Sequence, residues 1–270
     1  MRNPTEIIPG VLFSSYLTMG RKEKVGFWEH STLVLQVAGQ MFFKTETDQF
    51  TTKRGDVMLV RKNQLAELTK IPLPGEDYQT IVILLKEDLL RQIALEEQFT
   101  SMQAYTGPSN ILIPGNDFLH GFFQSILPYA LHPEQKALSE TLGLLKIKEA
   151  VQLLLHINPA LKTFLFDFSA SHKIDLERFM LTNYHFNVSV ARFAQLTGRS
   201  LAAFKRDFQQ VFDSSPRQWL QEQRLGEARR LIQDKQLKPS AIYLDLGFES
   251  LSHFSHAFKK KFGKAPSEWV

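Results

Sequence analysis

The chain has 270 residues, of which 43% are hydrophobic and 22% are charged, and its formal net charge at pH 7 is +4. This length and composition suit a globular protein of two modest domains. The lack of cysteine excludes a disulfide framework, a zinc–thiolate site and a cysteine nucleophile. The start of the chain lacks a signal-peptide pattern, and no apolar run approaches the ~20 residues that cross a bilayer. The sequence therefore predicts no membrane partner and a cytoplasmic, nucleoid-associated location.

The charge is unevenly distributed along the chain. Residues 171–270 contain 16 Lys and Arg against 10 Asp and Glu, a formal charge of +6. Residues 1–170 contain 16 against 18, a formal charge of −2. A basic C-terminal third joined to a slightly acidic body indicates an anionic partner for that third.

The first part of the chain has the pattern of a small β domain. Short apolar or alternating runs are separated by turn residues at Gly39, at 54–56 and at 73–77, which is typical of antiparallel strands. The clearest predicted strands are 33–38, 40–44, 57–60 and 80–85. This series favours a small antiparallel barrel or sandwich, which we place in residues 1–115.

From residue 117 the apolar period becomes that of helices. One predicted helix begins at Asp117 and ends near Pro128, and another spans 134–157 before Asn158 and Pro159. The apolar face of the second helix is wider than a lone surface helix needs. We therefore predict that residues 116–170 form a helical region that joins two chains as a homodimer and links to a separate domain, residues 171–270.

The last 81 residues contain one segment twice, because residues 190–220 align with residues 240–270 without a gap. Nine aligned positions are identical: Ala191/Ala241, Leu196/Leu246, Ser200/Ser250, Leu201/Leu251, Phe204/Phe254, Phe208/Phe258, Phe212/Phe262, Pro216/Pro266 and Trp219/Trp269. One structural unit was therefore copied, and we expect its ligand to present two equivalent binding sites, as a duplex polymer does.

In the first copy, two short helices are predicted to be joined by a glycine turn. Ser189 and Ser200 can cap helices over 190–196 and from 201 to about 211, with the turn at 197–199. The second helix carries an apolar stripe that would bury against the first helix, formed by Leu201, Phe204, Phe208 and Phe212. The residues expected to face a ligand are Arg199, Ser200, Ala202, Lys205, Arg206 and Gln209. This is the plan of a helix-turn-helix, whose second helix enters the major groove of DNA.

The second copy repeats this plan with a different outward face. Its first helix is predicted over 242–246, its turn over 247–249, and Ser250 caps the helix that follows. The outward residues are Ser252, His253, His256, Lys259 and Lys260. A continuous helix over 219–233, about 20 Å long at ~1.5 Å per residue, joins the two motifs. Their outward helices are therefore expected near the ~34 Å that separates successive major grooves.

Residues 176–270 resemble the DNA-binding domain of AraC/XylS-type transcription regulators. The matching residues are Phe193-Ala194, Thr197-Gly198-Arg199-Ser200, Phe204-Lys205-Arg206-Asp207-Phe208, Arg224-Leu225 with Ala228, Gly247-Phe248 with Ser250, Phe254, Phe258-Lys259-Lys260, Phe262-Gly263 and Pro266. The resemblance implies seven helices with two helix-turn-helix motifs and a bridging helix, and bacterial control of transcription, more often activation than repression. Regulators of this family often carry a cupin-like barrel, which implies that residues 1–115 are a sensor or regulatory domain. Residues 53–60 resemble the turn that cupins place before a strand.

These observations predict an α+β protein of two domains: a cupin-like β-barrel with a helical dimerisation region, and an all-α domain with two helix-turn-helix motifs joined by a long helix. We expect a bacterial regulator, not an enzyme, that binds double-stranded promoter DNA, recruits or blocks RNA polymerase, and uses no cofactor. The barrel leaves open a small-molecule effector, a protein ligand or a scaffolding role.

Two other classes of function stay open at this point. One is a cupin-type ligand-binding protein or enzyme with a helical protein-interaction domain, although a catalytic cupin needs clustered histidines and the strand region offers only His30 beside Glu29. The other is an interaction module whose basic faces meet an acidic protein. His253 and His256 lack nearby carboxylate or thiolate partners, so no metal site is predicted. Duplex binding that weakens steeply with salt yet keeps one preferred sequence would single out the DNA-binding class.

The second motif departs from the family pattern at His256, where family members usually carry an arginine. Histidine is mostly neutral at pH 7, reaches less far and lacks the guanidinium fork. We therefore expect Arg206→Ala to abolish specific binding and His256→Ala only to weaken it. A gel-shift series of both variants against one promoter measures this ranking, and equal losses would contradict it.

Overall fold

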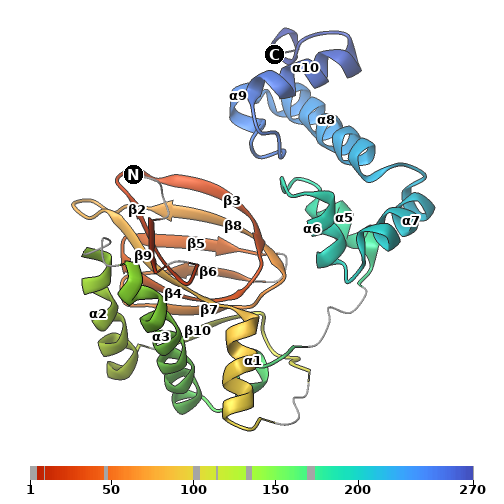
Figure 1. Ribbon diagram of the computed structural model, residues 1–270. Helices are drawn as coiled ribbons and strands as arrows, with labels where there is room; N and C mark the ends of the chain where they lie inside the picture. The colour runs from red at the N-terminus through yellow and green to blue at the C-terminus, as the bar shows by residue number, and fades with distance from the viewer. Residues whose placement is uncertain are drawn as a thin grey trace. The chain divides into compact units, whose positions relative to one another are not determined.

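The computed structural model describes residues 5–8, 10–45, 48–99, 104–113, 115–131, 136–168 and 174–269. The chain divides into two compact units: the first comprises residues 1–23 and 28–169, and the second comprises residues 170–270 together with the short segment 24–27. The first unit combines strands with helices, and the C-terminal part of the second, drawn from green-cyan to blue, consists of helices and turns (Figure 1). The predicted combination of an α+β chain with an all-α C-terminal domain is confirmed.

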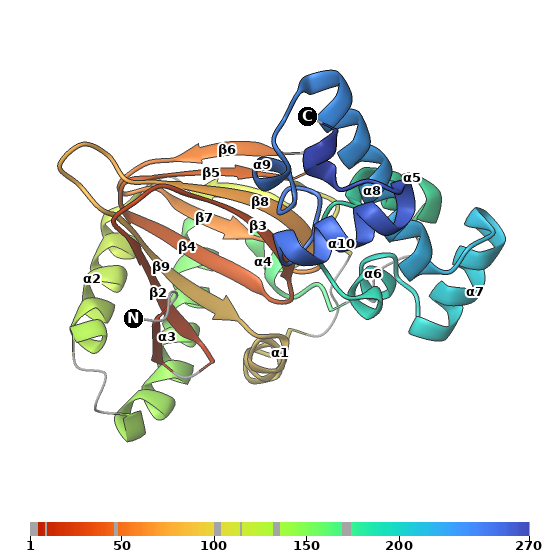
Figure 2. The ribbon, with the colours of Figure 1, turned by 90° about the horizontal axis from the view of Figure 1, so that it is seen from above.

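The first unit contains two antiparallel sheets. Its strands are β1 (Thr5–Ile8), β2 (Leu12–Leu17), β3 (Arg21–Trp28), β4 (Ser31–Ala38), β5 (Gln40–Lys44), β6 (Gln49–Thr52), β7 (Val57–Val60), β8 (Gln64–Ile71), β9 (Tyr78–Leu85) and β10 (Asn110–Ile113). One sheet has the order β1-β2-β9-β4-β7-β10 and the other the order β3-β8-β5-β6. The two sheets can be followed in Figure 2. The four strands expected from the sequence correspond to β4, β5, β7 and β9.

The cupin-like barrel is not confirmed, because the strands that the structure describes pair into two separate sheets and not into one closed barrel. Gly39 provides the physical reason at one corner. Its φ of +70° lies in the left-handed region, and a Cβ there would come within 2.7 Å of the Ile71 carbonyl oxygen. The chain can therefore turn sharply and pass from β4 in one sheet to β5 in the other, so that these consecutive strands have different partners.

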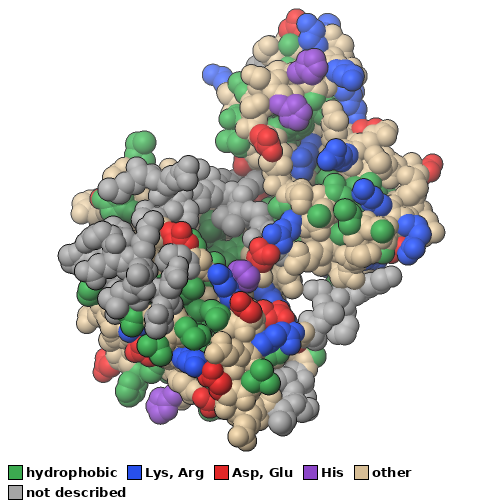
Figure 3. Space-filling model, viewed as in Figure 1, with side chains coloured by type: hydrophobic (Ala, Val, Ile, Leu, Met, Phe, Trp, Pro, Cys, Tyr) green, Lys and Arg blue, Asp and Glu red, His purple; other side chains and the backbone are tan. Residues whose placement is uncertain are grey.

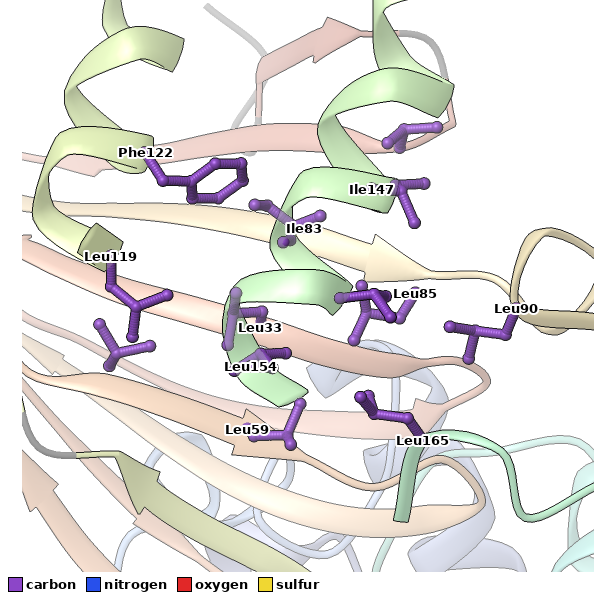
Figure 4. Packing of buried hydrophobic residues seen from close by; sticks show 14 of the residues in the cluster. Leu33, Leu59, Ile83, Leu85, Leu90, Leu119, Phe122, Ile147, Leu154 and Leu165 are labelled. Atoms are coloured by element: carbon purple, nitrogen blue, oxygen red, sulfur yellow. The ribbon is translucent and has the colours of Figure 1, made fainter. Parts of the chain in front are cut away.

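Helices of the first unit cover the six-stranded sheet. They are α1 (Glu87–Glu96), α2 (Asp117–Leu131), α3 (Lys136–Ile157) and α4 (Leu161–Leu165). Figure 4 shows Leu33 of β4 and Ile83 of β9 packed with Phe122 of α2 and with Ile147 and Leu154 of α3. Each of these side chains is buried, and the hydrophobic effect of this cluster holds the helices on the sheet.

The same packing accounts for the wide apolar face predicted between residues 134 and 157. Much of that face, including Ile147, Val151 and Leu154, lies on the sheet. Among the side chains of this region that the structure describes, Phe118 is 61% exposed and Leu145 is 54% exposed. Self-association through α2 and α3 stays a prediction, and it rests on these exposed residues.

The second unit contains α5 (Leu176–Asn183), α6 (Val190–Leu196), α7 (Leu201–Phe212), α8 (Pro216–Lys235), α9 (Pro239–Ile242), α10 (Leu251–Phe262) and a 3₁₀ helix at Pro266–Glu268. The predicted caps are confirmed. The side chains of Ser189, Ser200 and Ser250 accept hydrogen bonds from the backbone N–H groups of Arg192, Ala203 and His253. The connecting helix α8 is longer than expected because Ser215 caps it and Pro216 occupies its first turn.

The two copies bury their aromatic residues in the same arrangement. In the first, the rings of Phe208 and Trp219 are 5.6 Å apart and inclined at 79°. In the second, the rings of Phe258 and Trp269 are 5.8 Å apart and inclined at 88°. These edge-to-face contacts join each outward helix to the segment that follows it, so the repeated sequence produces a repeated core.

We expect Phe208→Ala to destabilise the second unit by about 3–5 kcal/mol, because the ring is fully buried and its removal leaves a cavity. Val211→Ala on the same helix is the matched control. Its side chain is 45% exposed, so we expect a change within about 0.5 kcal/mol. Urea unfolding of the full chain, followed through the transition of the second unit, measures both. Similar midpoints for the two variants would contradict the assigned core.

Candidate DNA-binding surface

The turn of the first motif is fixed by the backbone and by one buried threonine. Gly198 has a φ of +67°, and its N–H donates to the Gln195 carbonyl while the Arg199 N–H donates to the Ala194 carbonyl. This pair of bonds is a Schellman ending, which closes the C-terminus of α6. The hydroxyl of Thr197, fully buried, donates to the carbonyls of Phe193 and Ala194 at 2.9 and 3.0 Å. The entry of α7 is therefore held in a defined direction.

The second motif ends its first helix in the same way but one residue earlier. Gly247 has a φ of +79°, its N–H donates to the Leu244 carbonyl, and the Phe248 N–H donates to the Tyr243 carbonyl. The helix predicted over 242–246 is wrong in position: α9 spans Pro239–Ile242, and residues 243–247 form turns that carry these bonds. Gly198 and Gly247 are 49 positions apart, whereas the caps Ser200 and Ser250 are 50 apart. The second turn thus contains one residue more.

The outward face of α7 matches the sequence expectation. Ser200, Ala202, Lys205, Arg206 and Gln209 are exposed, while Phe204 and Phe208 on the opposite side are fully buried. The Arg206 guanidinium is 3.5 Å from the Asp207 carboxylate and remains 69% exposed. A contact this long and this exposed adds little stability, so the guanidinium can exchange it for a base edge or a phosphate.

Arg199 has a different environment. Its side chain is only 10% exposed, and its Nε donates to the Asp207 carboxylate at 3.1 Å. Its Nη1 donates to the carbonyls of Thr197 at 2.8 Å and Ile174 at 3.0 Å. These bonds tie the turn to α7 and to the segment before α5, which favours a structural role. A DNA contact by Arg199 stays a prediction.

The outward face of α10 is also exposed. Ser252, His253, His256, Lys259 and Lys260 lie on it, opposite the buried Phe254 and Phe258. The ring of His253 lies 5.9 Å from that of Phe248, which restrains the histidine next to the turn. Lys, Arg and His side chains are visible together on this unit in Figure 3.

A groove of about 1070 Å³ is lined by residues of both motifs and of α8. Lys205 and Gln209 of α7 line it, and His253 of α10 lines it as well. Arg217 and Gln221, exposed at the start of α8, also line this groove. These two residues are not among those predicted from the sequence, although Arg217 directly follows the helix-initiating Pro216. The groove therefore joins predicted residues of both motifs with a cation of the connecting helix.

A second cavity, of about 270 Å³, lies between the two sheets of the first unit. Phe13, Val34 and Met41 give it apolar walls. Lys70 brings one charge to it, and its Nζ is 3.0 Å from the Ser15 hydroxyl oxygen and 5.8 Å from the centre of the Tyr78 ring. Trp28 also lines this cavity.

Among the described residues, no group of three or more His, Asp and Glu side chains is placed to hold a metal ion. Within the same residues, no helix is both long enough and apolar enough to cross a membrane.

Two helix-turn-helix motifs on one chain, each with exposed Lys or Arg side chains on its outward helix, define a double helix-turn-helix DNA-binding protein. Comparison with known families agrees with this class. A model described as a helix-turn-helix domain matches residues 193–270, and a model described as the ExsA N-terminal regulatory domain matches residues 31–184.

Similar proteins extend over most of the chain. The virulence regulon transcriptional activator VirF of Yersinia enterocolitica is 26% identical over 257 residues, 89% of each chain. The regulator ExsA of Pseudomonas aeruginosa is 24% identical over 237 residues, 85% of this chain and 82% of its own. Among solved structures, ToxT of Vibrio cholerae covers 96% of this chain and 97% of its own, with 14% identity and a TM-score of 0.42.

The chain belongs to the AraC family of transcription regulators, in the group with an ExsA-type N-terminal regulatory domain. It is a DNA-binding regulator and not an enzyme, as the sequence predicted. The alternative of a cupin-type enzyme is thereby excluded.

Arg199 and Lys205 allow structure and DNA contact to be separated. We expect Arg199→Met to lower the thermal midpoint by several degrees, since the Thr197 and Ile174 carbonyls lose this donor, at a cost of about 1–3 kcal/mol. Lys205→Met should leave the midpoint unchanged and weaken DNA binding. Thermal unfolding and fluorescence anisotropy on the same samples measure the two effects. An unchanged midpoint for Arg199→Met would remove the structural role.

Proposed function

We propose that this chain activates transcription by inserting α7 and α10 into successive major grooves on one face of promoter DNA. The observation that carries the proposal is the repeated core, which turns Lys205 and Arg206 of one motif and His256 and Lys259 of the other to the outside. The name of VirF, a transcriptional activator, supports activation over repression.

Affinity and sequence preference come from different parts of this surface. The lysines of α10, with Arg217 at the start of α8, supply phosphate contacts that release counterions and make binding salt-dependent. The α7 face supplies base contacts, with Arg206 suited to a guanine edge and Gln209 to an adenine edge. Because the two outward faces differ, the preferred site is asymmetric.

The finer parts of the proposal concern partners. The cavity between the two sheets is the place where a small-molecule effector of a cupin-like sensor domain would bind, since apolar walls and one lysine suit a small molecule with an acceptor group. The exposed Phe118 and Leu145 are the contacts expected in a homodimer. Bound at a promoter in the cytoplasmic nucleoid, the protein would recruit RNA polymerase.

Selection of binding sites from a random duplex library tests the function. We expect an asymmetric site whose two half-sites are centred about one helical turn apart. On that site, the double variant Lys259→Gln/Lys260→Gln should reduce the slope of log affinity against log salt concentration by about 1.8, because two phosphate contacts are lost.

The double variant Lys53→Gln/Arg54→Gln is the matched control, because it removes the same charge from an exposed turn of the first unit. Its slope should equal that of the natural chain. An equal reduction in both double variants would show that net charge alone, and no contact by α10, sets the salt dependence. Failure to enrich any sequence would reject the function itself.

A further inference from the structure

Arg224, near the middle of α8, binds both motifs through one guanidinium group. Its Nε donates to the Tyr184 carbonyl at 2.8 Å and its Nη2 to the Phe186 carbonyl at 2.8 Å, in the segment that leads from α5 into α6. Its Nη1 donates to the Gly247 carbonyl at 3.1 Å, in the turn of the second motif. One side chain therefore links the entrance of the first motif to the turn of the second.

The chemistry of this contact requires arginine. The planar guanidinium directs three nitrogens at three carbonyls in fixed directions, which a lysine ammonium on its flexible stem cannot reproduce. Burial lowers the pKa of Arg224 to about 10, so the side chain is a cation at neutral pH. The three carbonyl oxygens replace part of its hydration.

The two linked segments also pack directly against each other. A Cβ at Gly247 would lie 2.6 Å from the His185 carbonyl oxygen and 2.9 Å from Cζ of Arg224. Two residues further along each segment, the Asn187 amide lies 3.5 Å from the Glu249 carboxylate. The motifs are thus joined by a side-to-side contact as well as through the length of α8.

The two turns differ in how their carbonyls are satisfied. In the gapless alignment of the two copies, Gly247 aligns with Thr197 and Glu249 with Arg199, whereas by its hydrogen bonds Gly247 corresponds to Gly198. The Thr197 carbonyl accepts from the nearby Arg199, whereas the Gly247 carbonyl accepts from Arg224 of the connecting helix. The second copy lacks the local arginine, and its turn is held from outside the motif.

We propose that Arg224 is a positioning residue that fixes the distance and orientation between α7 and α10, and so sets the half-site spacing that one chain accepts. This inference rests on the proposed function. With the two motifs held as one body, binding of the second half-site is intramolecular and gains affinity only where the DNA spacing matches. Without the guanidinium, the motifs can bind differently spaced half-sites, each more weakly.

The test uses the full chain and the site obtained by selection, together with duplexes in which the half-sites are moved closer or apart by one to three base pairs. The natural chain and the control Arg230→Met should lose about tenfold or more in affinity when the spacing is wrong. Arg230 is a suitable control because it lies on the same helix and pairs with Glu227 there. Arg224→Met should bind the correct spacing more weakly and all spacings within about threefold of one another.

The ratio of the affinity for the correctly spaced duplex to that for a wrongly spaced duplex distinguishes a positioning role from a purely structural role. Partial unfolding lowers the active fraction equally for every duplex and leaves the ratio unchanged, so an unchanged ratio for Arg224→Met overturns the proposal. If that variant does not fold, Arg224→Lys carries the test: an intermediate ratio supports the proposal, and a ratio equal to that of the natural chain overturns it. Absence of any preferred sequence in the natural chain would instead reject the proposed function.

Discussion

Burial of the aromatic stripe on α7 and α10 is the constraint on which the DNA-binding surface depends. Phe204, Phe208 and their counterparts Phe254 and Phe258 are fully buried, and exposing one of these rings to water would cost several kcal/mol. Since a helix is rigid, fixing one side of it in the core fixes the opposite side in solvent. The positions of Lys205 and Arg206 are therefore consequences of phenylalanine packing.

The same constraint allows the outward faces of the two copies to differ while their cores stay alike. Packing positions tolerate few changes because their side chains are buried and closely packed. The ring contacts of Phe208 with Trp219 and of Phe258 with Trp269 accordingly have similar geometry. Exposed positions have no such restriction, and they differ between the copies: Arg206 aligns with His256. The two copies therefore share a core and differ in their exposed side chains, which supports the proposal that one chain binds an asymmetric site.

The sequence predicted the features that depend on local patterns. The serine caps, the ends of α6 and the faces of α7 and α10 follow from residue type and helical period, and each was found in place. Features that depend on contacts between residues far apart in the chain could not be predicted from the sequence. The burial of Arg199 requires Asp207 on α7 and the Ile174 carbonyl, 25 residues earlier, and no local pattern distinguishes such an arginine from an exposed one. The split into two sheets likewise depends on which strands pair, and an alternating pattern does not specify partners.

Arg224 shows the same limit and adds a physical point about duplication. In the sequence, Arg224 stands out only as one of the residues that match the AraC family. Its bonding could not be predicted, because its three acceptors lie 38 to 40 residues before it and 23 residues after it. Copying a unit doubles its internal contacts but creates no contact between the copies. A link between the copies therefore needs residues from outside them or from the segment that connects them. Here the guanidinium of Arg224 on α8 binds the entrance of one copy and the turn of the other. Such a link holds the two motifs as one body, which the proposed selection of one half-site spacing requires. The order of the motifs along the chain and the different side chains on α7 and α10 make the proposed site directional.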